Sequence, residues 1–298
     1  MNTHLSRPAN FGVLVLAVIF WAALSMCSEG LAADKKAEDF SFDNYAAVLK
    51  DYVDAGGMVN YKKLKADRSR LDAFVKAMAE LDPKTFERWS ESQKIAFWLN
   101  AYNGLTLKAI IDNYPIKSSF FRSRVYPKNS IRQISGVWDK KYRVMGRDIS
   151  LDEIEHKVLR EKFDEPGIHM ALVCAAMSCP PLRNEPYLTA KLDTQLKDQT
   201  EKFLSDPKKF RIGSKNKIIY LSPIFKWFGD DFVGKYGAGS RIGRFSKKVS
   251  AVLNFVSKHI DADWGAPGGI DKYAISYLSY DWSLNEQPAP KGRGRSGR

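Results

Sequence analysis

The segment from Ser90 to Asn113 limits the fold most, because it predicts a long helix that is apolar on nearly every face. Ser90 and Gln93 have the spacing of a capping box, and Tyr114-Pro115 ends the helix. A surface helix has one apolar stripe, so a helix that is apolar all round lies inside a domain. We therefore expect the chain to pack around this helix. Its apolar residues are Ile95, Phe97, Trp98, Leu99, Tyr102, Leu105, Leu107, Ile110 and Ile111.

The rest of the chain alternates between helical and extended patterns, with helix in excess. Apolar residues at helical spacing predict helices over residues 42–55, 64–81, 151–162 and 242–260, and Ser222-Pro223 begins a short one. Ser150 and Glu153 form a second capping box. Residues 138–149 predict a hairpin, and strands are expected over 168–174, 217–221 and 273–278. We therefore predict an α+β fold, a single mixed domain over residues 34–286 with a small sheet packed by several helices.

The N-terminal residues 1–33 resemble a secretory signal peptide. Phe11 to Leu24 is an apolar run of 14 residues, shorter than the about 20 residues of a membrane span. The small-residue site Gly30-Leu31-Ala32 follows it, whereas bulky Met26 is unfavourable for lipoprotein cleavage before Cys27. We predict an exported protein, periplasmic or secreted, with no transmembrane span after cleavage. An uncleaved anchor is the alternative.

The chain is basic, with 47 lysines and arginines against 34 acidic residues and a net charge of +13. Four of these positive charges lie in the last eight residues, KGRGRSGR. Residues 287–298 have no large apolar side chain, so we expect a disordered tail. It either keeps the protein soluble or contacts an anionic envelope component or membrane surface. No nucleic-acid partner is expected for an exported protein.

Cys174 and Cys179 are the only cysteines after the predicted leader. In an oxidising compartment they can form a disulfide. They can also be small core residues, or one of them can be a nucleophile. With His156 and His169 they make four possible metal ligands, but this spacing matches no common zinc pattern. We therefore expect neither a metal nor another cofactor. Three roles stay open for the two cysteines: a disulfide, small core residues, or a nucleophile.

A nucleophilic cysteine needs a base, and histidines are scarce in this chain. His169 begins the predicted strand that holds Cys174, and His156 lies in the predicted helix 151–162. Asn100 and Asn103 share one face of the long buried helix, where an unpaired amide costs about 1–3 kcal/mol. Each amide therefore has a polar partner, which is the backbone, a water molecule or a group in a site.

Five blocks of the sequence resemble the domain-of-unknown-function 547 family: AFWLNAYNGLTLKAI (96–110), ISLDEIEHKVLR (149–160), IHMALVCAAMSCPPLRNEPY (168–187), LSPIFKWFGDDF (221–232) and YLSYDWSLNE (277–286). The resemblance covers residues 40–286. No activity is established for this family, so the resemblance implies a set of polar residues and not a reaction. These residues are Asn100, Asn103, Glu155, His156, His169, Cys174, Cys179, Lys226, Asp231, Asp281 and Asn285.

Two hypotheses of function follow. The first is an uncharacterised envelope protein with a ligand-binding or structural domain, in which Trp227-Phe228 and Tyr280-Asp281-Trp282 line a cleft. The second is a cysteine-dependent hydrolase or acyl-transfer enzyme. In it Cys179, or else Cys174, is the nucleophile, His169 or His156 the base, and Asn100 or Asn103 the orienting amide. The sequence has no phosphate-binding glycine loop and no serine nucleophile elbow, which argues against nucleotide chemistry and serine hydrolysis.

Overall fold

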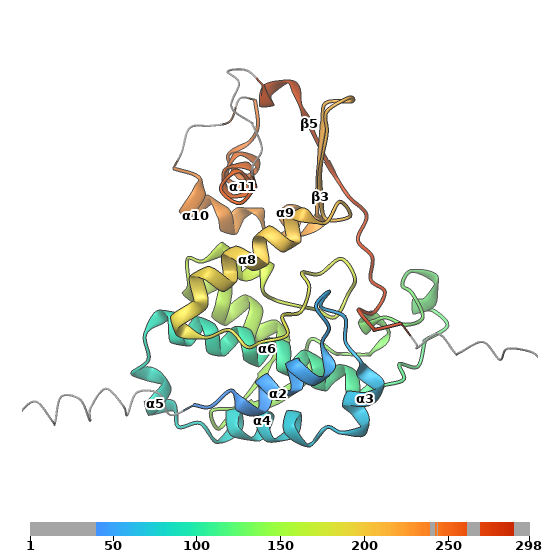
Figure 1. Ribbon diagram of the computed structural model, residues 1–298, viewed down its shortest axis with the longest axis vertical. Coiled ribbons are helices and arrows are strands. Elements are labelled where there is room, and N and C mark those ends of the chain that lie inside the picture. Colours follow the sequence, from blue (N-terminus) through green and yellow to red (C-terminus); the bar gives the residue numbers. More distant parts are fainter. Residues whose placement is uncertain (1–39, 239–241, 243, 261–268, 289–298) are drawn as a thin grey trace, which may run out of the picture. The chain divides into compact units, whose positions relative to one another are not determined.

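The computed structural model describes residues 40–238, 242, 244–260 and 269–288 of the 298-residue chain (Figure 1). The chain divides into two units, residues 1–41 and 42–298, and the second holds all the elements below. The predicted signal peptide and all but two residues of the predicted tail lie outside the described residues. Within those ranges, no helix combines the length and the apolar character that crossing a membrane requires.

The long helix α6 (Glu91–Asn113) is the centre of the N-terminal part, as predicted. Its capping box is complete: Gln93 donates its backbone N–H to Ser90 Oγ, and Ser90 donates its own to Gln93 Oε1. Nearly every side chain between Ile95 and Ile111 is buried. The apolar pattern therefore correctly predicted an interior helix.

Helices α2 (Asp43–Tyr52), α3 (Tyr61–Ala66), α4 (Ser69–Glu80) and α5 (Pro83–Glu87) lie with α6 in the lower part of Figure 1. The single helix predicted over 64–81 is wrong, because the backbone leaves helical geometry at Asp67 (φ −129°, ψ 75°). Helix α4 packs on α6 at Gly104, where a Cβ would lie 2.6 Å from the ring of Phe74. Glycine is therefore required at this close approach.

The predicted hairpin is confirmed as β1 (Lys141–Val144) and β2 (Arg147–Ser150), which pair antiparallel. Its two turn residues, Met145 and Gly146, both have positive φ, as a two-residue hairpin turn of this hand needs. The capping box of Ser150 and Glu153 is also complete.

The helix that follows this box starts at Leu151, is a π-helix, η3, over Glu153–Leu159, and continues as α7 (Arg160–Lys162). The sequence pattern predicted a helix here but did not predict its π-helical geometry. Single π-helical segments are rare and occur often at functional sites.

The strand predicted over 168–174 is wrong. Residues Pro166–Met170 form a 3₁₀-helix, η4, and the chain after it is a loop. Glu165 caps η4 by accepting the backbone N–H of Gly167 with its side chain. The segment is buried as expected, but a short buried apolar run has no periodicity that separates strand from helix.

The C-terminal part contains a three-stranded sheet of β3 (Phe210–Gly213), β4 (Ile218–Leu221) and β5 (Ala274–Tyr277). Strand β4 pairs antiparallel with β3 and parallel with β5. The sequence predicted β4 and β5 but missed β3 and the preceding helix α8 (Leu192–Ser205).

Short helices cover this sheet and form a second apolar core with it. They are α9 (Pro223–Trp227), η6 (Gly229–Asp231), α10 (Phe232–Tyr236) and α11 (Lys247–Ser257), with η5 (Thr189–Lys191) and η7 (Ile270–Lys272) at the connections. Six buried phenylalanines belong to this core: Phe203, Phe210, Phe225, Phe232, Phe245 and Phe255. The fold is therefore α+β, as predicted, but with two small sheets in place of one.

After β5 the chain returns to the helical part in extended form. Leu284 donates its N–H to the carbonyl of Asn129, and Asn285 donates its N–H to that of Ala175. The Asn285 side chain accepts a 2.6 Å hydrogen bond from the hydroxyl of Tyr61. These contacts fix the segment that carries Tyr280 and Trp282, and so they form one wall of the site below.

Candidate functional site

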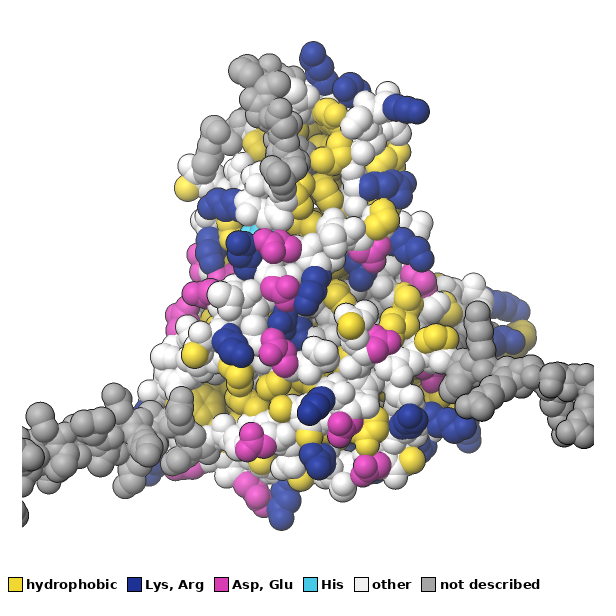
Figure 2. Space-filling view, viewed as in Figure 1, with side chains coloured by type: hydrophobic (Ala, Val, Ile, Leu, Met, Phe, Trp, Pro, Cys, Tyr) yellow, Lys and Arg dark blue, Asp and Glu magenta, His cyan; other side chains and the backbone are white. Residues whose placement is uncertain are grey.

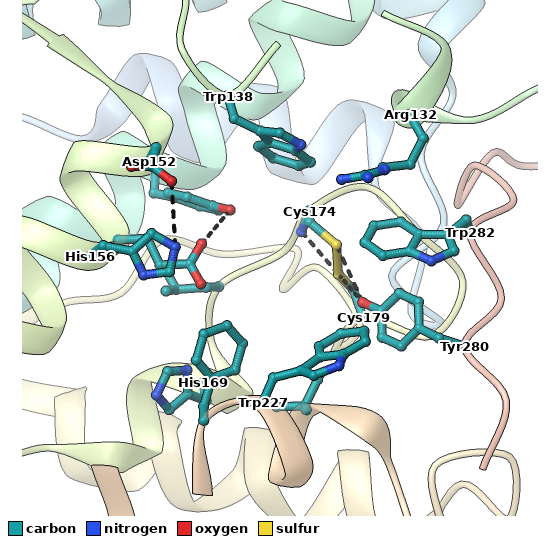
Figure 3. Close-up of a pocket in the computed structure, with 15 residues that line it drawn as sticks. Arg132, Trp138, Asp152, His156, His169, Cys174, Cys179, Trp227, Tyr280 and Trp282 are labelled. Atoms are coloured by element: carbon teal, nitrogen blue, oxygen red, sulfur yellow. Dashed lines mark hydrogen bonds and ion pairs between the residues drawn. A yellow bond between two sulfur atoms is a disulfide. The ribbon is translucent and has the colours of Figure 1, made fainter. Parts of the chain in front are cut away.

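A pocket of about 280 Å³ lies where the helical part, the 172–179 loop and the C-terminal segment meet (Figure 3). Elements far apart in sequence supply its walls. Its lining residues are Tyr102, Arg132, Trp138, Asp152, Glu155, His156, His169, Leu172, Cys174, Cys179, Ile224, Trp227, Phe228, Tyr280 and Trp282. Aromatic rings and a few polar groups of this kind are typical of a small-molecule site.

One wall is a cluster of three aromatic side chains. The ring of Tyr280 lies 4.6 Å from that of Trp282 and 4.9 Å from that of Trp227, between centroids. Trp227 is 46% exposed, so part of its indole face is free for a ligand. The guanidinium of Arg132 lies 5.1 Å from the Trp282 ring centre, a cation–π distance. We call Trp227, Tyr280 and Trp282 the aromatic wall.

Asp152, just before η3, and Glu155 within it form an acidic wall, with His156 beside them. All three side chains line the pocket. The buried hydroxyl of Tyr102 donates a 2.9 Å hydrogen bond to Glu155 Oε2. Burial, and after it the charge of Glu155, raises the pKa of Tyr102, so this phenol stays protonated as a donor.

A chain of polar contacts leads from the acidic wall to the interior. Arg160 Nη1 lies 2.7 Å from His156 Nδ1, and a guanidinium can only donate. His156 Nδ1 therefore faces a donor, and its Nε2 lies 3.5 Å from Asp152 Oδ1. Arg160 also binds both carboxylate oxygens of Asp231, at 2.6 and 2.9 Å.

His169 is buried and is the last residue in this series of polar contacts. Its Nε2 lies 2.8 Å from Asp231 Oδ2. Its ring stacks on Phe228 at 4.4 Å. Burial disfavours the charged carboxylate, but hydrogen bonds from His169 and Arg160 outweigh it and hold the pKa of Asp231 well below its usual range. His169 lines the pocket, but its Nε2 is occupied by Asp231, and not by a cysteine as the hydrolase hypothesis expected.

Cys174 and Cys179 form a disulfide bond that lines the pocket. The hydroxyl of Tyr280 lies 3.1 Å from the Cys179 sulfur and 3.4 Å from the Cys174 sulfur. The sequence left three roles open for these cysteines, namely a disulfide, core residues or a nucleophile. The structure shows the disulfide. Neither sulfur is a nucleophile while this bond persists, so a catalytic cysteine remains a prediction for the reduced protein only. In the described ranges, no three His, Cys, Asp or Glu side chains form a metal-binding group.

Asn100 and Asn103 have backbone partners. Asn100 donates to the carbonyl of Tyr187 at 2.8 Å and accepts its N–H at 2.9 Å. Asn103 donates to the carbonyl of Ala171 at 3.0 Å and accepts the N–H of Val173 at 2.9 Å. Neither amide lines the pocket, and both hold backbone groups of the loops between 171 and 187. A role for either as an orienting amide stays a prediction.

Comparison with known families bears on the same region. Residues 86–204 match the family model described as a protein of unknown function, DUF547. This segment resembles the DUF547 family. No curated protein and no solved structure matches the chain.

The DUF547 segment contains the acidic wall, the disulfide and both backbone-binding asparagines. The aromatic wall lies C-terminal to it, although its residues stand in the blocks noted above. Sequence reasoning missed Tyr102, Asp152 and Arg132 as pocket residues. Asp152 had a usable signal, because it lies three and four residues before Glu155 and His156 on a predicted helix.

Proposed function

We propose that the protein is an exported binding protein whose pocket holds a small neutral ligand with a hydroxyl-bearing ring, as a sugar has. The observation that carries this proposal is the aromatic wall in one pocket with the carboxylates of Asp152 and Glu155. The C–H face of such a ring is apolar and packs on flat aromatic faces. Its hydroxyls are donors, which carboxylates accept well in a partly enclosed site.

The charge of the pocket supports a neutral ligand. Asp152 and Glu155 bring two carboxylates, and Arg132 brings one cation. The guanidinium of Arg160, which lies 2.7 Å from His156 Nδ1, is paired with the carboxylate of Asp231 and is not among the pocket-lining residues. The net charge of +13 in the whole chain is therefore not concentrated in this site, and an anionic ligand is not favoured here.

Export is part of the proposal. A disulfide persists in oxidising compartments and is rare in the reducing cytosol. The Cys174–Cys179 bond therefore supports the periplasmic or secreted location expected from the first 33 residues.

A cysteine-dependent hydrolase is the weaker proposal. It needs the disulfide reduced and a histidine free to take the proton of Cys179. Here the polar side chain beside the Cys179 sulfur is Tyr280, and the Nε2 of His169 is bonded to Asp231. Burial, and then the charge of Glu155, raises the pKa of Tyr280, so this phenol is a donor and not a base.

The test is a titration followed by tryptophan fluorescence and calorimetry, with glucose, N-acetylglucosamine and maltose as probes. We expect saturable binding of at least one sugar, and a loss of about tenfold or more in Trp282→Ala. Phe120→Ala removes an exposed aromatic ring that does not line the pocket, and is the matched control. Binding of tetramethylammonium but of no sugar would overturn the proposal in favour of a cation-binding cage.

A further inference from the structure

A loop outside the pocket exposes an unusual amount of apolar surface. Phe120 is 71% exposed, Phe121 76% and Val125 73%. Across the described part of the chain, the only other exposed large hydrophobic side chain is Trp227, which lines the pocket and is less exposed, at 46%. Contiguous apolar groups on a surface mark a site of interaction. The loop carries the 3₁₀-helix η1 (Arg122–Arg124) and lies at the outer edge of the fold, in green on the right of Figure 1.

The same loop is strongly basic. Residues 113–138 contain no aspartate or glutamate but five basic residues, Lys117, Arg122, Arg124, Lys128 and Arg132. None of the five forms an ion pair with any residue that the structure describes. Elsewhere on the face in Figure 2, side chains of both charges are mixed. The loop therefore presents uncompensated positive charge around its apolar tip.

The tip is held in shape by a buried glutamine in η2 (Ile131–Gln133). Gln133 Oε1 accepts the backbone N–H of Ser119 at 3.0 Å. Its amide donates to the carbonyls of Pro127, at 3.0 Å, and Tyr126, at 3.3 Å. Arg122 in turn donates to the carbonyl of Gln133 at 3.1 Å. The exposed phenylalanines thus stand on a loop with a defined backbone, so little ordering is needed when they bind.

We propose that the loop 117–128 docks the protein on the surface of an anionic phospholipid bilayer. Phe120, Phe121 and Val125 enter the boundary between headgroups and acyl chains, and the basic side chains bind headgroup phosphates. Charge complementarity favours a lipid surface, since basic side chains without acidic neighbours surround the apolar tip. This site is distinct from the basic C-terminal segment KGRGRSGR, which has no large apolar side chain in its sequence.

Docking can be tested separately from ligand binding. None of the three apolar tip residues lines the pocket. The base of the loop does reach it, because the Arg132 guanidinium lies 4.6 Å from the ring of Tyr126 and 5.1 Å from that of Trp282. Variants at the tip are therefore the informative ones, and Arg132 is left unchanged.

The experiment is co-sedimentation of the mature, full-length protein with vesicles of phosphatidylcholine alone or with about a quarter phosphatidylglycerol. Phe120→Ser with Phe121→Ser removes the apolar tip and keeps every charge. Lys117→Gln with Arg124→Gln and Lys128→Gln removes three exposed charges. The matched control is Lys50→Gln with Lys62→Gln and Lys84→Gln, three exposed lysines on other elements. Circular dichroism checks that each variant is folded.

We expect the wild type to bind the anionic vesicles and not the neutral ones. The phenylalanine pair should bind more than about tenfold less tightly, and the loop charge variant about a hundredfold less tightly at low salt. The control should bind like the wild type. The proposal is overturned if no vesicle is bound, if the phenylalanine pair binds normally, or if the control loses as much affinity as the loop charge variant.

Discussion

The hydroxyl of Tyr102 donates a 2.9 Å hydrogen bond to Glu155 Oε2, and so joins the central helix α6 to the acidic wall of the pocket. Tyr102 is buried, and its pKa is raised, so the phenol is always the donor of this pair. The carboxylate of Glu155 is thereby held in place by a helix that is buried along most of its length. Such a contact from an interior helix is how a protein fixes a polar group in a binding site.

Replacing Tyr102 tests this contact directly. We expect Tyr102→Phe to lower the free energy of unfolding by about 2 kcal/mol, because the ring packing stays but a hydrogen bond to a charged group is lost. Urea denaturation measures the change. Tyr142→Phe is the matched control, since the buried Tyr142 hydroxyl has no partner within the described structure. The assignment fails if the control is destabilised as much as Tyr102→Phe.

The disulfide gives a chemical prediction. Intact mass after alkylation of the exported protein should show no modified cysteine before reduction and two after it. Cys174→Ala with Cys179→Ala should lower the free energy of unfolding by about 2 kcal/mol, as expected for a short closed loop. A thiol that alkylates rapidly in the native, unreduced protein would contradict the bond and revive the hydrolase hypothesis.

The hydrogen bonds of Asp231 with His169 and Arg160 should make the free energy of unfolding depend on pH. The pKa of Asp231 is lower in the folded than in the unfolded state, so its ionised form stabilises the fold above the unfolded value of about 3.9. This stabilisation is lost progressively as the pH falls below that value. At neutral pH, Asp231→Asn should cost about 2 kcal/mol.

The difference between wild type and Asp231→Asn should therefore shrink between neutral pH and about pH 2. Thermal or urea unfolding over that pH range provides the measurement. Asp230→Asn changes the neighbouring residue, whose carboxylate is exposed and pairs only with Lys248 among the described side chains. A difference that stays constant with pH in Asp231→Asn would show that its contacts do not favour the charged form.

Replacing Asn100 should lower the stability of the fold, because this amide binds the backbone and does not line the pocket. Asn100→Ala leaves the buried N–H and carbonyl of Tyr187 without their partners, and we expect a cost of about 2–4 kcal/mol. Asn113→Ala, at the exposed end of the same helix, should cost less than about 0.5 kcal/mol. If Asn100→Ala is as stable as wild type but no longer binds ligand, the structural role assigned to this amide is wrong.

The parts of the structure that the sequence predicted are those that depend on neighbouring residues. The capping boxes at Ser90 and Ser150 and the N-cap at Ser222 each join groups within three positions, so a short pattern identifies them. The interior helix α6 was predictable for the same reason, because its apolar residues occur all round one continuous segment. The blocks that resemble the DUF547 family are likewise local.

Only the tertiary structure decided the pocket and the state of its residues. Four separate parts of the chain supply the pocket residues Tyr102, Glu155, Trp227 and Tyr280. No periodic pattern in the sequence predicts that these residues line the same pocket. The conformation of the buried run 168–174 could not be read from its own residues, because Asn103, which binds the backbone of Ala171 and Val173, lies far away in sequence. The fate of Cys174 and Cys179 depended on that loop, since a sulfur becomes bonded, buried or reactive according to which atoms the fold places beside it.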